Sequence, residues 1–404
     1  MFRTPPLALR SESLAVIILL TALTAVTPLS IDMPLPALPM LAEALSAPAD
    51  QAQLLVGVFL AGFACAQLIA GPLSDRFGRR PILLTGLTAY LVLSAAASVV
   101  TSLETLLVIR LFQGIAACAA PVAARAIVAD VHEGPAAQRA MSIVTAGMGF
   151  APVLAPSIGA LVLEFTNWRG IFWTLTATAA ALLLVVWLFL KESRPTDKIA
   201  SLNLGVLLRQ YFAIGTARKF LDYALPSMFA GGALFTFLSA GTFVLQEELG
   251  VTTRHFGFMF AGVMLGFVAG ATLAGIYSPK LGIDKSILLG LVFSTIGGAV
   301  MLGLWLVGIS QWAAIILPMA CVMFGMGILR PNSIAGSMAS FRHVAGSASA
   351  LIGFFQMAAG ATAGLLLLLL PYHPGDVMPI LVATYPALSL LIFGLMRAKP
   401  TKTR

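Results

Sequence analysis

Two ionisable residues within apolar stretches of the chain, Asp32 and Arg110, are the first candidates for chemistry. A charged side chain is costly inside a membrane, so those that occur there usually mark an ion pathway, a substrate site or a proton relay. If the two stretches are membrane helices that begin at Leu14 and Glu104, a rise of about 1.5 Å per residue places both residues in the outer third of a ~30 Å apolar core. An acid and a guanidinium at similar depth are suited to binding a proton and a substrate in competition.

Two effects act on such a carboxyl in opposite directions. Burial in an apolar bundle disfavours the ionised form, whereas a nearby guanidinium favours it. We predict that this competition brings proton binding by Asp32 within reach of ambient pH. The plainer alternatives are an interfacial acid that ends its helix before Pro34, and a structural or snorkelling arginine at position 110.

A second concentration of charge is the stretch GPLSDRFGRRP, which begins at Gly71 and lies between two apolar runs. Gly71 and Gly78 predict tight turns and a close approach of helices. Asp75 is expected to pair with Arg76, with Arg79 or with a neighbouring helix end, and such a pair can hold helix ends together until it breaks. The arginines are also explained as positively charged anchors of a membrane loop, but the acid is not.

Glycine and proline recur in GFAPVLAPSIG, whose candidate residues are Gly149, Pro152, Pro156 and Gly159. Two prolines four residues apart remove backbone donors and bend a helix, and the glycines permit close packing across the interface between the two helix bundles.

Four further residues, Gln113, Phe235, Met323 and Gln356, are candidates for lining a pocket. Phe and Met side chains in the second half of the chain would give an apolar and adaptable cavity, which suits hydrophobic, weakly polar compounds of varied shape. The alternative is that Phe235 and Met323 belong to an ordinary core or face lipid.

The composition indicates what must position these residues. Of the 404 residues 59% are hydrophobic and 10% are charged, whereas a soluble domain has about 25% charged residues. Apolar runs of about 20 residues match the length of a membrane-spanning helix, and alternating strand patterns are absent, so we predict an all-α membrane protein. The twelve expected spans are 14–34, 52–72, 81–100, 104–128, 138–163, 169–190, 220–244, 255–277, 286–308, 311–330, 343–370 and 377–397.

The distribution of positive charge predicts the orientation of these spans. With the N-terminus in the cytoplasm, 20 of the 24 Lys and Arg residues fall on the cytoplasmic side, as the positive-inside rule requires. The net charge of +8 therefore orients the chain and contacts anionic lipid, and we do not expect nucleic acid as a partner. Both termini are predicted to be cytoplasmic.

The two halves of the sequence are repeats. Residues 62–78 align without gaps on residues 266–282, with six identical positions that include Gly62/Gly266 and Gly78/Gly282. The polar stretch 191–219 lies between them. We therefore predict a six-helix bundle at 1–190, a cytoplasmic linker at 191–219 and a second six-helix bundle at 220–404.

These motifs resemble those of the major facilitator superfamily, whose members consist of two six-helix halves. GPLSDRFGRRP is similar to the superfamily's signature loop, and RLFQG at 110–114 to the Arg motif of its drug:proton antiporters. TPLSIDMPLPALP at 27–39, FLSAGTFV at 237–244 and HVAGSASAL at 343–351 resemble the bicyclomycin-resistance (Bcr/CflA) subfamily.

The resemblance implies roles for particular residues. It assigns substrate binding and proton coupling to Asp32 and Arg110, a gate to the signature loop, and antiport to the Gly/Pro motif. That motif departs from the family pattern at Ala155 and Ala160, where glycine is typical, and Pro34 replaces the usual aromatic residue.

From these observations we expect a transporter of the bacterial inner membrane that exports small amphiphilic compounds by alternating access. Drugs such as phenicols or bicyclomycin-like molecules are the expected substrates, and exchange for protons is the expected energy source. A carrier of nucleosides, siderophores or amino-acid derivatives is the alternative. We expect a monomer without enzymatic activity, cofactor or metal, because the three cysteines lie in separate spans and no phosphate-binding motif is present.

Overall fold

A computed structural model describes residues 13–194, 204–341, 344–370 and 374–398. In these residues the secondary structure is helical, and twelve helical segments are long and apolar enough to cross a membrane. The predicted all-α fold with twelve spans is therefore confirmed.

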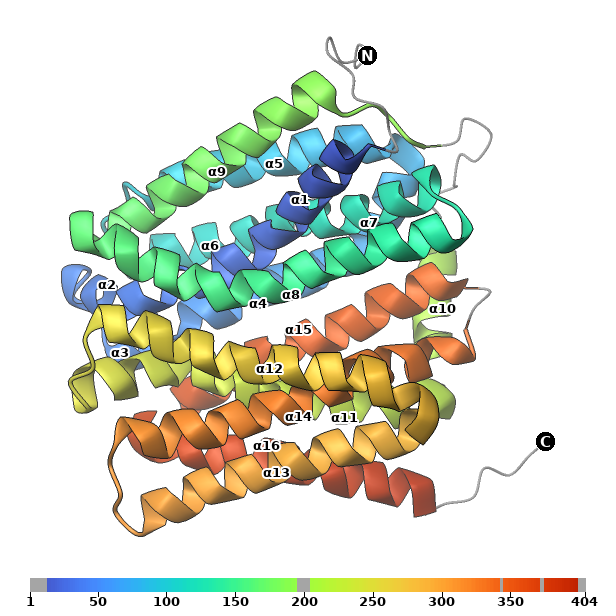
Figure 1. Ribbon diagram of the computed structural model, residues 1–404. Helices are drawn as coiled ribbons and strands as arrows, with labels where there is room; N and C mark the ends of the chain where they lie inside the picture. The colour runs from blue at the N-terminus through green and yellow to red at the C-terminus, as the bar shows by residue number, and fades with distance from the viewer. Residues whose placement is uncertain (1–12, 195–203, 342–343, 371–373, 399–404) are drawn as a thin grey trace. The chain divides into compact units, whose positions relative to one another are not determined.

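Figure 1 shows the helices coloured in chain order, from blue at the N-terminus to red at the C-terminus. The first half contains α1 (Leu14–Asp32), η1 (Leu35–Ala37), α2 (Leu38–Ala44), α3 (Ala49–Ala52), α4 (Leu54–Phe77), α5 (Arg79–Ala97), α6 (Leu103–Ala117), α7 (Ala119–Val131), α8 (Gly134–Phe165) and α9 (Trp168–Phe189). The second half contains α10 (Leu204–Gly215), α11 (Arg218–Phe243), η2 (Val244–Glu248), α12 (Thr253–Leu281), α13 (Ile283–Leu306), α14 (Trp312–Ala339), α15 (Ala345–Leu369) and α16 (Pro374–Ala398).

Contacts between residues divide the chain into two compact units. The first comprises residues 1–47 and 58–204, and the second comprises residues 48–57 and 205–404. Within the stretch predicted as a linker, the structure describes one helix, α10, and residues 195–203 lie outside the described part. The division into 1–190, 191–219 and 220–404 stays a prediction.

Several predicted spans end too early, and the two largest differences involve proline. The helical segment that begins with α1 continues through η1 and α2 to Ala44, because Pro36 and Pro39 lie in the first turns of new helical segments, where proline is tolerated. Similarly, α14 runs through Pro331 to Ala339 instead of ending at position 330. α14 thus extends nine residues beyond the predicted end of its span at Arg330.

Glycines set the closest helix crossings, and the same crossing occurs in both halves. A Cβ on Gly62 of α4 would lie 2.0 Å from the carbonyl oxygen of Leu111 on α6. The repeat-related Gly266 of α12 would place a Cβ 2.5 Å from the carbonyl oxygen of Ala320 on α14. Only glycine allows backbones to approach so closely, which explains why the repeat keeps this residue.

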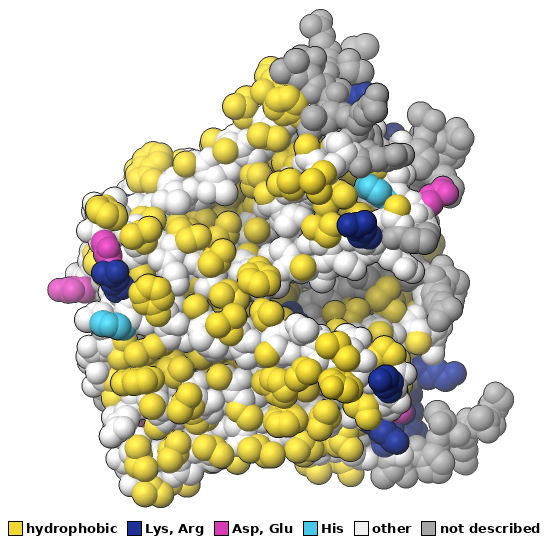
Figure 2. Space-filling model, in the orientation of Figure 1, with side chains coloured by type: hydrophobic (Ala, Val, Ile, Leu, Met, Phe, Trp, Pro, Cys, Tyr) yellow, Lys and Arg dark blue, Asp and Glu magenta, His cyan; other side chains and the backbone are white. Residues whose placement is uncertain are grey.

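The outward faces of the helices are apolar. In Figure 2 hydrophobic side chains cover the visible helices of each unit, and the charged side chains lie toward helix ends. Large apolar residues such as Leu161 and Leu265 are more than half exposed. Such faces suit contact with lipid acyl chains, since in water exposed apolar patches of this extent would promote aggregation.

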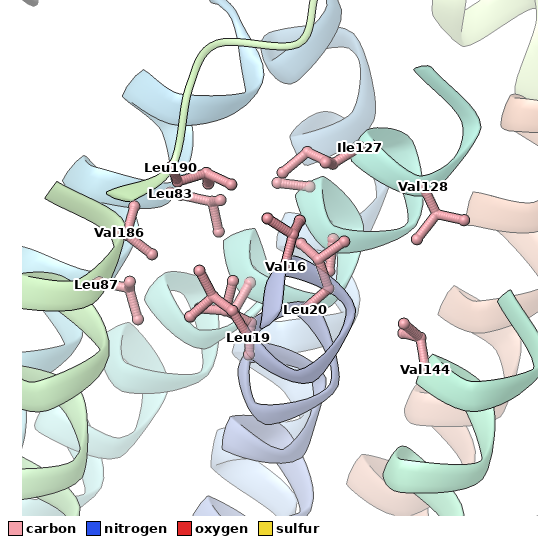
Figure 3. Close-up of a cluster of buried hydrophobic side chains, with 14 of the residues drawn as sticks. Val16, Leu19, Leu20, Leu83, Leu87, Ile127, Val128, Val144, Val186 and Leu190 are labelled. Carbon is pink, nitrogen blue, oxygen red and sulfur yellow. The ribbon is translucent and has the colours of Figure 1, made fainter. Parts of the chain in front are cut away.

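The core of the first unit contains a cluster of buried aliphatic side chains around the first turns of α1 (Figure 3). Leu83 of α5, Val128 of α7 and Leu190, just after α9, belong to this cluster. Each lies within four residues of a charged side chain described below. The apolar contacts therefore fix the places from which those charged side chains extend.

Candidate functional site

Asp32 is the last residue of α1 and is 4% exposed. Its side chain has no ion pair or hydrogen bond within the part of the chain that the structure describes. The following turn packs against α8, where a Cβ on Gly159 would lie 2.2 Å from the carbonyl oxygen of Met33. Gly159 therefore permits α8 to close over the end of α1 next to the acid.

Arg110 is fully buried on α6 and is held by neutral groups. Its guanidinium donates to the side-chain oxygen of Gln113 over 2.8 Å and to the carbonyl oxygen of Ser30 over 2.9 Å. Its carbon Cζ also lies 4.4 Å from the centre of the Phe59 ring, a geometry in which the ring face attracts the cation. Because Ser30 is in the last turn of α1, these contacts bind Arg110 to the turn that ends at Asp32.

The hydrogen-bond chain continues onto α5. Gln113 donates to the Ser94 hydroxyl over 2.7 Å, Ser94 donates to the Tyr90 carbonyl oxygen, and the Tyr90 and Ser30 hydroxyls lie 2.5 Å apart. The network thus joins α1, α5 and α6 and fixes the orientation of the guanidinium.

Sequence reasoning placed Gln113 at the site but missed Tyr90 and Ser94. A signal for both was present, since they are hydroxyl residues four apart on one face of an apolar helix. The proposed roles of Asp32 and Arg110 in proton coupling and binding stay predictions.

The Gly/Pro motif lies within α8. α8 runs without interruption through Pro152 and Pro156. Gly159 lies close to Met33 in the turn after α1, whereas a Cβ on Gly149 would meet no atom within 4 Å. The second close contact comes instead from Gly147, where a Cβ would lie 2.0 Å from the Thr21 methyl group on α1. The predicted packing of the motif's glycines across the interface between the two bundles stays a prediction.

The signature loop forms a cluster of charges at one end of the first unit. Arg79 pairs with Asp75 over 2.5 Å and with Asp130, at the end of α7, over 2.9 Å. The side chains of Arg79 and Asp130 are 10% and 13% exposed, whereas that of Asp75 is 51% exposed. The pairing of Asp75 with Arg79 was predicted, but Asp130 was missed because it is distant in sequence.

The loop arginines differ from one another. Arg76 is exposed and lies against the Phe77 ring, so it fits a solvated anchor. Arg79 and Arg80 are 8% and 4% exposed, and Arg80 donates to the carbonyl oxygen of Trp187 on α9. These two arginines therefore have structural partners within the unit, and their role as positively charged anchors stays a prediction.

Glu192, in the segment after α9, is the last member of this charge cluster. Its carboxylate accepts hydrogen bonds from the backbone N–H groups of Arg79 and Arg80 over 2.9 and 3.2 Å. These N–H groups open α5 and have no partner within the helix, and the positive end of the helix dipole favours an acid there. Sequence reasoning noted the polar stretch that contains Glu192 but gave this residue no role.

Gly78 is required by this arrangement, but Gly71 is not. Gly78 has φ +102°, and a Cβ there would lie 2.5 Å from the Glu192 carboxylate. Gly71 lies inside α4, and a Cβ there would meet no atom within 4 Å. The prediction of close packing at Gly71 is wrong.

The remaining pocket candidates lie in the second unit. Phe235 on α11 and Met323 on α14 are 5% and 1% exposed. Gln356 on α15 accepts hydrogen bonds from Arg330 and donates to Ser227 on α11. Whether any of them contacts a transported compound stays a prediction.

The sequence profile of the Major Facilitator Superfamily matches residues 20–364. The chain belongs to this superfamily. The transporter is a multi-pass membrane protein, as its twelve apolar helical segments require.

Its relatives extend over most of the chain. It is 32% identical over 353 residues to the Bacillus subtilis "Uncharacterized MFS-type transporter YdgK", with 87% of each chain covered. It is 32% identical to a "Chloramphenicol resistance protein" of Pseudomonas aeruginosa, over 83% of this chain and 80% of the relative. It is 25% identical to the "Bicyclomycin resistance protein homolog" of Haemophilus influenzae, over 96% and 97%.

Solved transporter structures share the fold. The nucleoside transporter NupG has a TM-score of 0.76 at 13% identity and covers 96% of this chain and 100% of its own. The xylose transporter XylE from E. coli has a TM-score of 0.72 at 13% identity, with coverage of 96% and 98%. These similarities show the fold and carry no information on the substrate.

We expect opposite effects on stability when Gly78 and Gly71 of the signature loop are each replaced by alanine. Gly78→Ala places a side chain in a backbone region that is nearly restricted to glycine and also against Glu192, so we expect a loss of about 1–3 kcal/mol in stability. Gly71→Ala should be neutral or slightly stabilising, since alanine favours a helix. Thermal unfolding of the purified variants in one detergent measures both. Equal melting temperatures would contradict the account of Gly78.

The two acids that pair with Arg79 are expected to contribute unequally to stability. Asp130→Asn breaks a buried pair, and we expect a loss on the order of 3 kcal/mol, the lower end for such pairs because Asp75 still neutralises the arginine. Asp75→Asn breaks a half-exposed pair and should cost about 0–1 kcal/mol. A larger loss for Asp75→Asn in denaturant unfolding would overturn this ranking.

Proposed function

We propose that this transporter exports small amphiphilic compounds, including drugs such as phenicols or bicyclomycin-like molecules, in exchange for protons. The names of its relatives, which include chloramphenicol and bicyclomycin resistance proteins, support the substrate class. The observation that carries proton exchange is the buried Asp32 carboxyl, for which the described residues supply no ion pair or hydrogen bond.

An ionised carboxylate in this position is costly, because burial removes water and nothing described replaces it. Asp32 therefore holds a proton while its surroundings are closed to water. Opening of the site to water on one side hydrates the carboxyl and releases the proton there. A substrate that enters the opened site then occupies the space beside the ionised group, so proton and substrate exclude one another.

Arg110 acts as a fixed positive charge that is bound to the same turn of α1 through the Ser30 carbonyl oxygen. Its contacts with Gln113, the Ser30 carbonyl and Phe59 hold the guanidinium against the last turn of α1. The cation favours the ionised carboxyl once water enters, which opposes the effect of burial. The balance between these two effects lets the direction of opening decide whether Asp32 is protonated.

The signature loop serves as the gate of this cycle. Arg79 stays with the buried Asp130, whereas the half-exposed Asp75 is free to exchange partners as helix ends move. Asp75 lies in the last turn of α4, where the negative end of the helix dipole disfavours a carboxylate. A cation from another segment therefore stabilises it, which suits this role.

The cellular setting of this proposal follows from the charge distribution. We infer a monomer in the bacterial inner membrane with both termini in the cytoplasm, since most Lys and Arg residues then lie on the cytoplasmic side. The proton gradient supplies the energy, and the two six-helix halves, with a linker at 191–219, alternate access between the two sides.

Asp32→Asn keeps the shape of the side chain but cannot exchange a proton. In proteoliposomes with an imposed pH gradient, it should reduce gradient-driven chloramphenicol transport to the level of empty vesicles while substrate binding remains measurable. Asp376→Asn, which removes an exposed acid from the start of α16, is the matched control and should transport normally.

Arg110→Lys extends the same experiment. It keeps the charge but loses the planar fork that reaches Gln113 and Ser30 together, so transport should fall about tenfold or more. If Asp32→Asn still transports in response to the gradient, the proton site lies elsewhere in the chain.

If Asp75 is a gate residue, its replacement should slow transport without affecting folding. Asp75→Asn should fold and insert normally but slow the transport rate, because Arg79 loses the partner that exchanges. The measurement is the initial rate of efflux at matched protein levels in the membrane. A wild-type rate would count against Asp75 as a gate residue.

A further inference from the structure

The second unit contains a partly buried cation that the transport mechanism above does not use. Arg330 is on α14, nine residues before the end of that helix at Ala339. Its Nε and Nη2 atoms both donate to the side-chain oxygen of Gln356, over 3.3 and 3.2 Å. Gln356 in turn donates to the hydroxyl of Ser227 over 3.1 Å.

The three residues come from three helices at one depth. Ser227 lies nine residues from the start of α11, and Gln356 lies eleven from the start of α15. With Arg330 nine residues from the end of α14, a rise of about 1.5 Å per residue places all three about 14–17 Å from the same ends of their helices. Since the three helices have 25 to 28 residues, all three residues lie within membrane-spanning segments, with Ser227 and Arg330 nearer to those ends than to the opposite ends of their helices.

Arg330 differs from two other arginines of this unit, which form ion pairs. Arg218 is paired with Asp222, and Arg397 is paired with Asp284. Within the described residues no acidic side chain pairs with Arg330, and one neutral amide oxygen accepts both of the hydrogen bonds described for it. A guanidinium has five N–H donors, so most of its capacity is left for another acceptor.

Two hydroxyls on the same stripe of α14 are also unsatisfied. Ser333 and Ser337 are three and seven residues after Arg330, spacings that share a helix face. Both are 0% exposed, and within the described residues their hydroxyl oxygens have no hydrogen-bond partner. Buried hydroxyls without partners are uncommon, and here they add donors to the side of the helix that carries the cation.

We propose that Arg330, Gln356 and Ser227 form a binding site for the carboxylate, or a similar planar anionic group, of a transported compound. A guanidinium binds a carboxylate through two parallel hydrogen bonds, and a partly buried cation that no acidic side chain pairs with gains free energy from one. When such a group binds, it replaces the side-chain oxygen of Gln356 as the acceptor of the Arg330 hydrogen bonds. The proposal rests on the proposed export function, and it names acidic amphiphiles as a substrate class.

The test compares an acid with its neutral ester. Nalidixic acid is a small amphiphile with one carboxylate, and its methyl ester has the same ring system without the charge. Equilibrium binding to the purified wild-type protein should favour the acid by about tenfold or more. Arg330→Gln should remove this preference by weakening the acid alone, and Arg330→Lys should weaken it less.

Two further variants separate binding from folding. Gln356→Glu places a carboxylate beside Arg330, so it should keep or raise the melting temperature while binding of the acid is lost. Arg209→Gln removes an exposed cation from α10 and should leave the acid-to-ester ratio unchanged. Equal affinities of the wild-type protein for acid and ester, or an unchanged ratio in Arg330→Gln, would overturn the proposal.

Chloramphenicol transport in the same preparations distinguishes this failure from failure of the export function. If the wild-type protein transports chloramphenicol along a proton gradient but does not prefer the acid, only the anion site is wrong. If the acid binds through Arg330 but the gradient drives no transport, the site stands and the export function is wrong.

Discussion

The cost of placing a guanidinium among apolar helices shapes the functional parts of this molecule. Arg79 and Arg110 are buried, Arg330 is partly buried, and each of the three is stabilised in a different way. Arg79 has two carboxylates, Arg110 has neutral acceptors and an aromatic ring, and Arg330 has one amide oxygen. A fully neutralised cation is stable in place and suits a structural gate, whereas a cation with spare donors gains free energy from a ligand. The degree of compensation therefore separates the gate arginine, Arg79, from the proposed anion-binding arginine, Arg330.

Close helix packing makes these arrangements possible. Gly62 lets α4 and α6 touch, which brings the Phe59 ring of α4 beneath Arg110, and Gly159 lets α8 cover the end of α1 beside Asp32. At the other end of the first unit, Leu83, Val128 and Leu190 belong to one buried aliphatic cluster. These residues set the starting points of Arg79, Asp130 and Glu192. Apolar packing and backbone approach thus position every charged group of the first unit that the proposed mechanism uses.

The sequence predicted the twelve helices because hydrophobic length and charge placement are local signals. It also identified Asp32, Arg110 and the Asp75–Arg79 pair, since a charge in an apolar run is conspicuous. Partners contributed by distant segments were missed, as Asp130, Glu192, Tyr90 and Ser94 show, because tertiary contacts alone bring them together. The early span ends predicted at Arg330 and after α1 share one cause. Proline was taken to end a helix, whereas here a helix passes through Pro331 and a new helical turn starts after Pro34.

The central claim is that Asp32 gives up its proton when a substrate binds. Proton release on addition of chloramphenicol to purified protein in weakly buffered solution, followed with a pH-sensitive dye, tests this directly. The wild-type protein should release protons in proportion to the bound substrate, and Asp32→Asn should bind the substrate and release none. Equal proton release by both proteins would contradict the assignment of the coupling site to Asp32.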